Sequence, residues 1–220
     1  MSIAVVTGAS SGIGAATAKL LAANGFEVIA AARRMDRLND LEKNHPNIKA
    51  EQLDVTDQKS VDDFVEKLGG KGIAVLVNNA GGAFDSISIE NAKPENWQKS
   101  YEVNVIGALR ITKALLPNLR ANGKSHIVVV TSTAGHGVYE NGGSYTSAKH
   151  AELAFAQTLR LELNGEPIRI TEIAPGMVKT DEFAKNRFAG DTTKAAKIYE
   201  GVAEPLTAAD VAESIRWSVM

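Results

Sequence analysis

The 220-residue chain carries 24 Lys and Arg residues against 26 Asp and Glu residues, a formal net charge of −2, and no cysteine. The balanced charge offers no basic run for nucleic acid, the lack of cysteine excludes disulfides and thiolate chemistry, and no apolar run reaches the roughly 18 residues of a membrane helix. The chain enters an apolar strand at once, with no room for a secretory signal. A cytoplasmic protein without nucleic acid or membrane partners is therefore expected.

Short apolar runs rich in Val and Ile alternate with amphipathic stretches, a pattern typical of strands that are buried on both faces and joined by helices. The sequence predicts strands at Ile3–Thr7, Glu27–Ala32, Ile48–Leu53, Ala74–Val77, His126–Thr131 and Ile168–Ile173, and helices near 13–24, 36–44, 57–68, 94–121 and 144–164. No repeat or linker interrupts this alternation. It predicts one α/β domain over residues 1–220, a doubly wound, Rossmann-like parallel sheet with right-handed crossovers.

The last predicted helix begins at a capping box formed by Thr207 and Asp210. It runs to the end of the sequence at Met220, where a regular β/α alternation would continue with another strand. Either the sheet ends there without a last strand, or the natural chain continues beyond Met220.

Three glycines, Gly8, Gly12 and Gly14, lie in the turn between the first strand and the first helix. Small residues let the backbone approach a pyrophosphate closely, and the free N–H groups of the helix start bind its charge. A glycine-rich turn without a ligand is the alternative interpretation. The flanking strand and helix favour a dinucleotide site.

The end of the second strand reads Ala32-Arg33-Arg34. Enzymes that use NAD place a carboxylate at this point, where it binds the ribose hydroxyls. Here there is none, and two guanidinium groups suit a 2′-phosphate instead. The sequence predicts NADP as cofactor, the alternative being two solvated surface arginines.

A set of short motifs, each at a predicted strand end or helix, resembles the short-chain dehydrogenase/reductase family across essentially the whole chain. A Tyr and a Lys four residues apart occur in many proteins by chance, but the ordered set is specific. Its members are Thr7–Gly14, Asn78–Gly81, Ser132, Tyr145 with Lys149, and Pro175-Gly176. The turn at Arg33 and the segment 204–210 look closest to NADP-dependent members that oxidise 3-hydroxy acids such as serine.

The resemblance implies a role for each matching residue. Ser132, Tyr145 and Lys149 are the expected catalytic residues, and Asn104 is expected to anchor a water in the proton relay. Asp54 is expected at the adenine, and Thr180 at the carboxamide or the pyrophosphate. The expected cofactor-binding residues are Gly8, Ser10, Ser11, Gly12, Ile13, Gly14, Arg33, Arg34, Asp54, Val55, Asn78, Ala80, Gly81, Tyr145, Lys149, Pro175, Gly176, Val178 and Thr180.

The residue types agree with this chemistry. Lys149 follows Tyr145 by four positions, one helical turn along the same face, and an ammonium beside a phenol favours the phenolate. A hydroxyl at Ser132 can donate to the substrate oxygen. Asn104 has a poor propensity for the middle of a helix, which suggests a functional reason for its presence.

The predicted function is NADP-dependent interconversion of a small alcohol, of which a 3-hydroxy acid is one candidate, and its carbonyl compound. A non-catalytic dinucleotide sensor is the alternative, and a sugar-nucleotide epimerase would need a longer chain. A substrate lid is expected near residues 177–197. The helices 94–121 and 144–164 are expected to pack against a second copy in a dimer or tetramer. The four histidines show no metal-ligand spacing, so no metal is expected.

Overall fold

The computed structural model describes residues 1–188 and 190–220. Six parallel strands form one sheet in the order β3-β2-β1-β4-β5-β6. Their bounds are β1 Ile3–Thr7, β2 Glu27–Ala32, β3 Ile48–Gln52, β4 Val75–Asn78, β5 Ser125–Val130 and β6 Ile168–Ile173. All six predicted strands and the doubly wound α/β class are confirmed. The strand order reverses between β1 and β4, the point at which sheets of this kind bind ligands.

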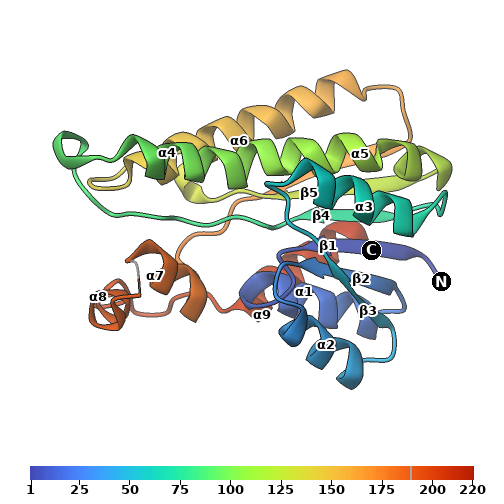
Figure 1. Cartoon of the computed structure of the whole chain (residues 1–220), viewed down its shortest axis with the longest axis horizontal. Helices are drawn as coiled ribbons and strands as arrows, with labels where there is room; N and C mark the ends of the chain where they lie inside the picture. Colours follow the sequence, from blue (N-terminus) through green and yellow to red (C-terminus); the bar gives the residue numbers. More distant parts are fainter. Residues whose placement is uncertain (189) are drawn as a thin grey trace.

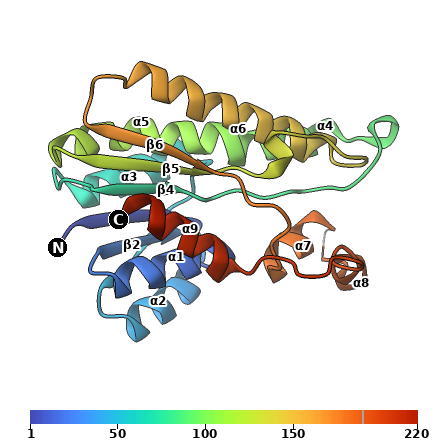
Figure 2. The same ribbon diagram turned by 180° about the vertical axis from the view of Figure 1, so that it is seen from behind.

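Helices cover both faces of the sheet (Figures 1 and 2). One face carries α1 (Gly12–Ala23), α2 (Met35–Asn44) and α9 (Ala208–Val219), and the other carries α3 (Gln58–Leu68), α4 (Pro94–Tyr101), α5 (Gly107–Ala121) and α6 (Gly143–Glu162). The predicted capping box of Thr207 and Asp210 begins α9.

Strand β1 shows how the sheet divides the core into two. Val5 packs with Phe64 of α3 on one face, and Val6 packs with Leu21 of α1 and Ile215 of α9 on the other. Successive strand residues point to opposite faces, so a run of apolar residues supplies both cores at once. Each fully buried Leu, Ile or Phe side chain contributes about 1.5–3 kcal/mol. This double burial explains why the strands read as continuous apolar runs.

The predicted single helix over 94–121 is divided in the structure. A π-helical turn, Glu102–Ile106, separates α4 from α5. At this turn the Asn104 side chain donates from Nδ2 to the Ser100 carbonyl at 2.7 Å, which offers that carbonyl a partner outside the α-helical ladder. Widened turns of this type frequently occur at functional sites.

The segment predicted as a lid contains two short helices, α7 (Asp181–Arg187) and α8 (Thr192–Lys197). Both lie beyond the carboxyl ends of the strands, away from the two helical layers (Figures 1 and 2). The segment is tied back to the fold where Val178 forms a parallel bridge with Leu206. Its movement as a lid stays a prediction.

Several large apolar side chains on the outer helices are exposed, among them Tyr101, Leu109 and Leu161. They lie on the helices expected to pack against a second copy. The homo-oligomer itself stays a prediction.

Strands β3 and β6 form the two edges of the described sheet, and a further strand beyond Met220 also stays a prediction. Within residues 1–188 and 190–220, no helix combines the length and apolar character needed to cross a membrane.

Candidate active site

The loop after β1 is compressed against the loop after β4. Gly8 and Gly12 have φ of +67° and +54°, a left-handed backbone that other residues rarely adopt. A Cβ on Gly14 would lie 2.5 Å from both Asn79 Nδ2 and the Gly8 carbonyl oxygen. The loop can therefore take this path only with glycine at these positions.

Polar contacts hold the two loops together. The Thr7 hydroxyl accepts hydrogen bonds from the backbone N–H groups of Asn79 and Ala80, both at 3.0 Å. Asn79 Nδ2 donates to the Thr7 carbonyl at 2.8 Å. Asn78 instead points into the core and donates to Thr112 Oγ1 at 2.8 Å. The sequence analysis placed both residues in the motif Asn78–Gly81 but counted only Asn78 among the cofactor-binding residues, although the alternation along β4 places neighbouring side chains on opposite faces.

These loops and the ends of β2 and β3 enclose one side of a cleft, which we call the glycine-loop cavity. Of the residues predicted to bind the cofactor, it is lined by Gly8, Ser10, Ser11, Gly12, Ile13, Arg33, Arg34, Asp54, Val55, Ala80, Gly81, Tyr145, Lys149 and Thr180. Asn79 lines it as well, whereas Gly14 and Asn78 support it from behind.

Arg34 lies directly on the glycine loop. Its Nη2 donates to Ser10 Oγ at 3.0 Å and to Ser11 Oγ at 2.9 Å, and its Nη1 forms an ion pair with Glu182 of α7 at 2.8 Å. Glu182 also pairs with Arg37 at 3.0 Å. Hydrogen bonds from Arg34 first, and then from Arg37, hold the pKa of Glu182 below its usual value. Arg33 is exposed at the rim of the same cavity.

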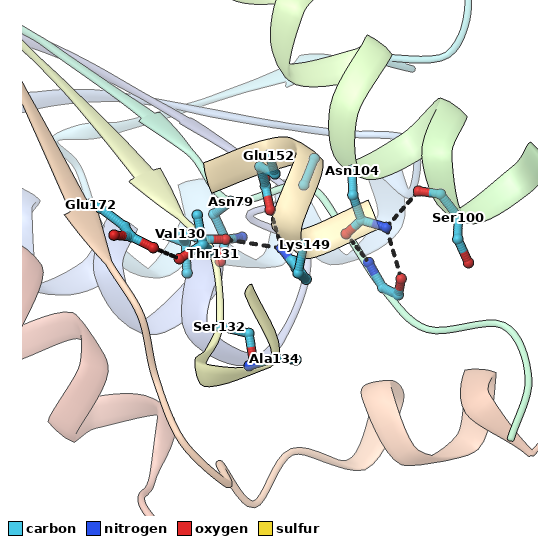
Figure 3. A network of polar contacts seen from close by, with 12 residues as sticks. Asn79, Ser100, Asn104, Val130, Thr131, Ser132, Ala134, Lys149, Glu152 and Glu172 are labelled. Carbon is cyan, nitrogen blue, oxygen red and sulfur yellow. Dashed lines mark hydrogen bonds and ion pairs between the residues drawn. The ribbon is translucent and has the colours of Figure 1, made fainter. Parts of the chain in front are cut away.

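Tyr145 and Lys149 project from α6 and are both buried. Lys149 Nζ donates to the Val130 carbonyl at 3.1 Å and to the Glu152 carboxylate, as Figure 3 shows. It lies 5.8 Å from the centroid of the Tyr145 ring. The spacing read from the sequence thus brings the phenol and the ammonium together.

Glu152 is a buried carboxylate that the sequence analysis missed. It follows Lys149 by three positions and so shares its face of α6. Burial raises its pKa to about 7, against the opposing effect of the Lys149 ammonium, and the nearby Glu172 carboxylate raises it further. Burial acts to lower the pKa of Lys149, but the charges of Glu152 and Tyr145 outweigh it and the net shift is upward. The sequence did contain a signal for Glu152, because an acidic residue on the same helix face as Tyr145 and Lys149 points toward the predicted site.

Asn104 has no exposed surface. Its Oδ1 accepts from the Gly82 N–H at 3.1 Å, and its Nδ2 donates to the Gly82 carbonyl at 2.9 Å. A Cβ on Gly81 would lie 2.6 Å from Asn104 Oδ1 and 3.6 Å from Lys149 Nζ. The amide therefore fixes the loop after β4 beside the lysine (Figure 3), and a glycine is needed between them.

Ser132 caps the turn after β5, where its Oγ accepts from the Ala134 N–H at 3.1 Å. It lines a second cavity of about 420 Å³, which we call the Ser132 cavity. Pro175, Gly176 and Val178 line this cavity, together with residues of α7 and the segment after it. Tyr145 lines both cavities, so its side chain lies where they meet.

Comparisons with known proteins agree with this geometry. A family model described as short chain dehydrogenase matches residues 2–189. An uncharacterized oxidoreductase of Mycobacterium tuberculosis is 51% identical over 213 residues, which cover 97% of this chain and 83% of that protein. The NADP-dependent 3-hydroxy acid dehydrogenase YdfG of Escherichia coli is 35% identical over 98% of this chain and 88% of its own length.

Solved structures are similar along nearly the whole chain. The closed form of a serine dehydrogenase complexed with NADP+ aligns with a TM-score of 0.93 and 35% identity, covering 98% of this chain and 88% of that one. A short-chain dehydrogenase from Streptomyces avermitilis aligns with a TM-score of 0.86 and 30% identity, covering 99% and 83%.

Proposed function

Because the chain belongs to the short-chain dehydrogenase family, we propose that it is an NADP-dependent oxidoreductase that interconverts a 3-hydroxy acid and its carbonyl compound. The observation that carries this proposal is the position of Tyr145. The phenol lines both cavities and has Lys149 one helical turn away on α6. A proton donor at the junction of a dinucleotide site and a second cavity suits reduction of a carbonyl group.

The glycine-loop cavity fits NADP. Its positive-φ glycines Gly8 and Gly12 bring the loop backbone to the cavity wall, where the N–H groups at the start of α1 would bind a pyrophosphate. Arg34 on the loop serines and Arg33 at the rim would bind the 2′-phosphate. Asp54 would lie at the adenine. The residues from Pro175 to Thr180 would hold the nicotinamide end.

NADP supplies or accepts the hydride when it is bound. In the reducing direction, the Tyr145 hydroxyl donates its proton to the carbonyl oxygen, and the Lys149 ammonium stabilises the phenolate that remains. The Ser132 hydroxyl donates a hydrogen bond to the same oxygen and so stabilises the negative charge that develops there. Asn104 and Glu152 hold the groups around Lys149 in place, since both contact its immediate surroundings.

The 3-hydroxy acid class rests on the relatives. Two of the similar proteins are named for such substrates, the 3-hydroxy acid dehydrogenase and a serine dehydrogenase. Serine is itself a 3-hydroxy acid. The Ser132 cavity is lined mainly by apolar and aromatic side chains. A substrate with a short carbon chain matches that lining.

A cofactor-coupled screen tests the proposal. NADP+ and NAD+ are each supplied with serine, 3-hydroxybutyrate, 3-hydroxypropionate, a 2-hydroxy acid and a simple secondary alcohol, and absorbance at the nicotinamide band is followed. We expect turnover with NADP+ and the 3-hydroxy acids. A protein that binds NADPH tightly but turns over none of these substrates, or their carbonyl counterparts in reverse, would contradict the 3-hydroxy acid proposal.

A further inference from the structure

Arg187, the last residue of α7, is the only charged side chain that lines the Ser132 cavity among the residues that the structure describes. The rest of the lining is apolar, aromatic or neutral, including Phe183, Phe188 and Tyr199. Arg187 does not line the glycine-loop cavity. Its charge therefore faces the space beyond Tyr145 and not the phosphates of a dinucleotide.

The guanidinium is held in place but is not neutralised. Its Cζ lies 5.2 Å from the centroid of the Tyr139 ring and 6.0 Å from that of Phe188, and its Nη2 is 3.4 Å from Ser86 Oγ. Aromatic faces attract a guanidinium and fix its plane. In the described part of the chain, no carboxylate forms an ion pair with Arg187.

One donor of this guanidinium is left over. The Nε of Arg187 is shielded from water and has no hydrogen-bond partner among the described residues. A buried N–H of a charged group without an acceptor is costly to the fold. An acceptor that arrives with a ligand would remove this cost.

The position along α7 suits a ligand that reacts at Tyr145. Phe183 meets the Tyr145 ring edge-on, with the ring centroids 5.4 Å apart. Arg187 follows Phe183 by four positions, which places it about 6 Å further along the same face of the helix. A compound with its hydroxyl carbon at Tyr145 and an anion a few bonds away would span this interval.

We propose that Arg187 binds the carboxylate of the substrate and so selects hydroxy acids over neutral alcohols. This inference rests on the proposed function and adds the residue that recognises the acid. Two N–H groups of a guanidinium form parallel hydrogen bonds to the two oxygens of a carboxylate. Such a pair orients the hydroxyl carbon toward Tyr145 and Ser132 as well as binding the charge.

The test compares 3-hydroxybutyrate with its neutral amide, 3-hydroxybutyramide, as substrates with NADP+. The wild-type enzyme, Arg187→Gln, Arg187→Lys and a control, Lys185→Gln, are assayed side by side. Lys185 lies on the same helix and is exposed outside the cavity. We expect Arg187→Gln to lower kcat/KM for the acid about 10- to 100-fold, the effect of losing hydrogen bonds to a charged group. The amide should change little, Arg187→Lys should fall between, and Lys185→Gln should match the wild type.

A binding measurement that needs no turnover accompanies the kinetics. With NADPH present, 3-hydroxybutyrate should raise the Tm of the wild type and of Lys185→Gln but not that of Arg187→Gln. A wild type that prefers the acid, combined with an unchanged preference in Arg187→Gln, overturns the role of Arg187 and leaves the proposed function standing. A wild type that neither oxidises nor binds the acid overturns the substrate class and this inference with it. Unchanged amide turnover in Arg187→Gln shows that its site is still folded.

Discussion

The glycine-loop cavity and the Ser132 cavity meet at Tyr145, but they are built in different ways. The first is shaped mainly by backbone, by the loops after β1 and β4, which pack so closely that a Cβ on Gly14 would collide. The second is shaped by side chains such as Phe183 and Arg187, which come from α7 beyond the sheet. Backbone shape recognises a group that all dinucleotides share, whereas side chains recognise what differs between substrates.

The two cavities are also connected through α7. Phe183 of this helix packs on Tyr145, and Glu182 forms ion pairs with Arg34 and Arg37 at the glycine loop. The same short helix thus contacts the arginine proposed for the 2′-phosphate and the phenol proposed for proton transfer.

The largest effect is expected at the junction. Tyr145→Phe removes the proton donor and keeps the ring, so kcat should fall by about 100-fold or more, the usual contribution of a positioned acid or base. NADPH binding, followed by nicotinamide fluorescence, should be preserved. Tyr101→Phe, on the exposed outer surface of α4, serves as control. Turnover near the wild-type level in Tyr145→Phe would remove Tyr145 from the mechanism.

Beneath the junction, Glu152 should make the stability of the fold depend on pH. Its pKa is raised to about 7 in the folded state, so the folded protein keeps a proton that the unfolded chain has already released. The wild type should then lose stability as the pH rises from about 4.5 to 7, by about 1.4 kcal/mol per pH unit at most. Glu152→Gln should lack this loss.

The measurement is urea denaturation of both proteins at several pH values, with the exposed Glu162→Gln as control. The pKa of His126 is lowered to about 4, mainly by burial and also by the charge of Arg169. Both proteins therefore lose stability as the pH falls below about 6.5, where the unfolded chain binds this proton and the folded protein does not. That contribution is common to both proteins and cancels in the difference. A difference between Glu152→Gln and the wild type that stays constant from pH 5 to 7 would show that Glu152 is ionised throughout.

In the glycine-loop cavity, the two arginines should set the choice of cofactor. Arg34→Ala should lower kcat/KM for NADPH by about 10-fold or somewhat more, because a hydrogen bond to a phosphate is worth roughly 1.5–3 kcal/mol. Arg33→Ala should have a smaller effect of the same kind, since Arg33 is exposed and salt screens it. The ratio of NADPH to NADH activity at two ionic strengths is the measurement. A ratio unmoved by both substitutions would contradict the assignment.

The smallest effect is expected at the link between the cavities. Glu182 neutralises part of the charge of Arg34, and both side chains are partly exposed, at 28% and 39%. Glu182→Gln should therefore tighten NADPH only a few-fold, in keeping with the modest strength of exposed ion pairs. NADH, which has no 2′-phosphate, should not change. Glu200→Gln, exposed in the same segment of the chain, is the control, and equal tightening of both cofactors would contradict the explanation.

The sequence by itself determined the sheet and the glycine loop. Both are local in origin. Apolar runs predict strands buried on two faces, and glycines at a strand end predict a close approach of the backbone. The spacing of Tyr145 and Lys149 is equally local, since four positions on a helix place two side chains on one face. Such relations depend on a few neighbouring residues, so they can be read without the fold.

Only the tertiary structure decided which side chains from distant parts of the chain meet. Glu182 contacts Arg34 across 148 positions of the sequence, and Arg187 contacts Ser86 across 101 positions. Neither contact can be predicted from the spacing of neighbouring residues. Asn104 of the π-helical turn likewise meets Gly82, which bonds to its side-chain amide from another loop. Periodicity specifies the elements because burial acts on each of them separately, whereas the pairing of polar side chains follows from how those elements pack together.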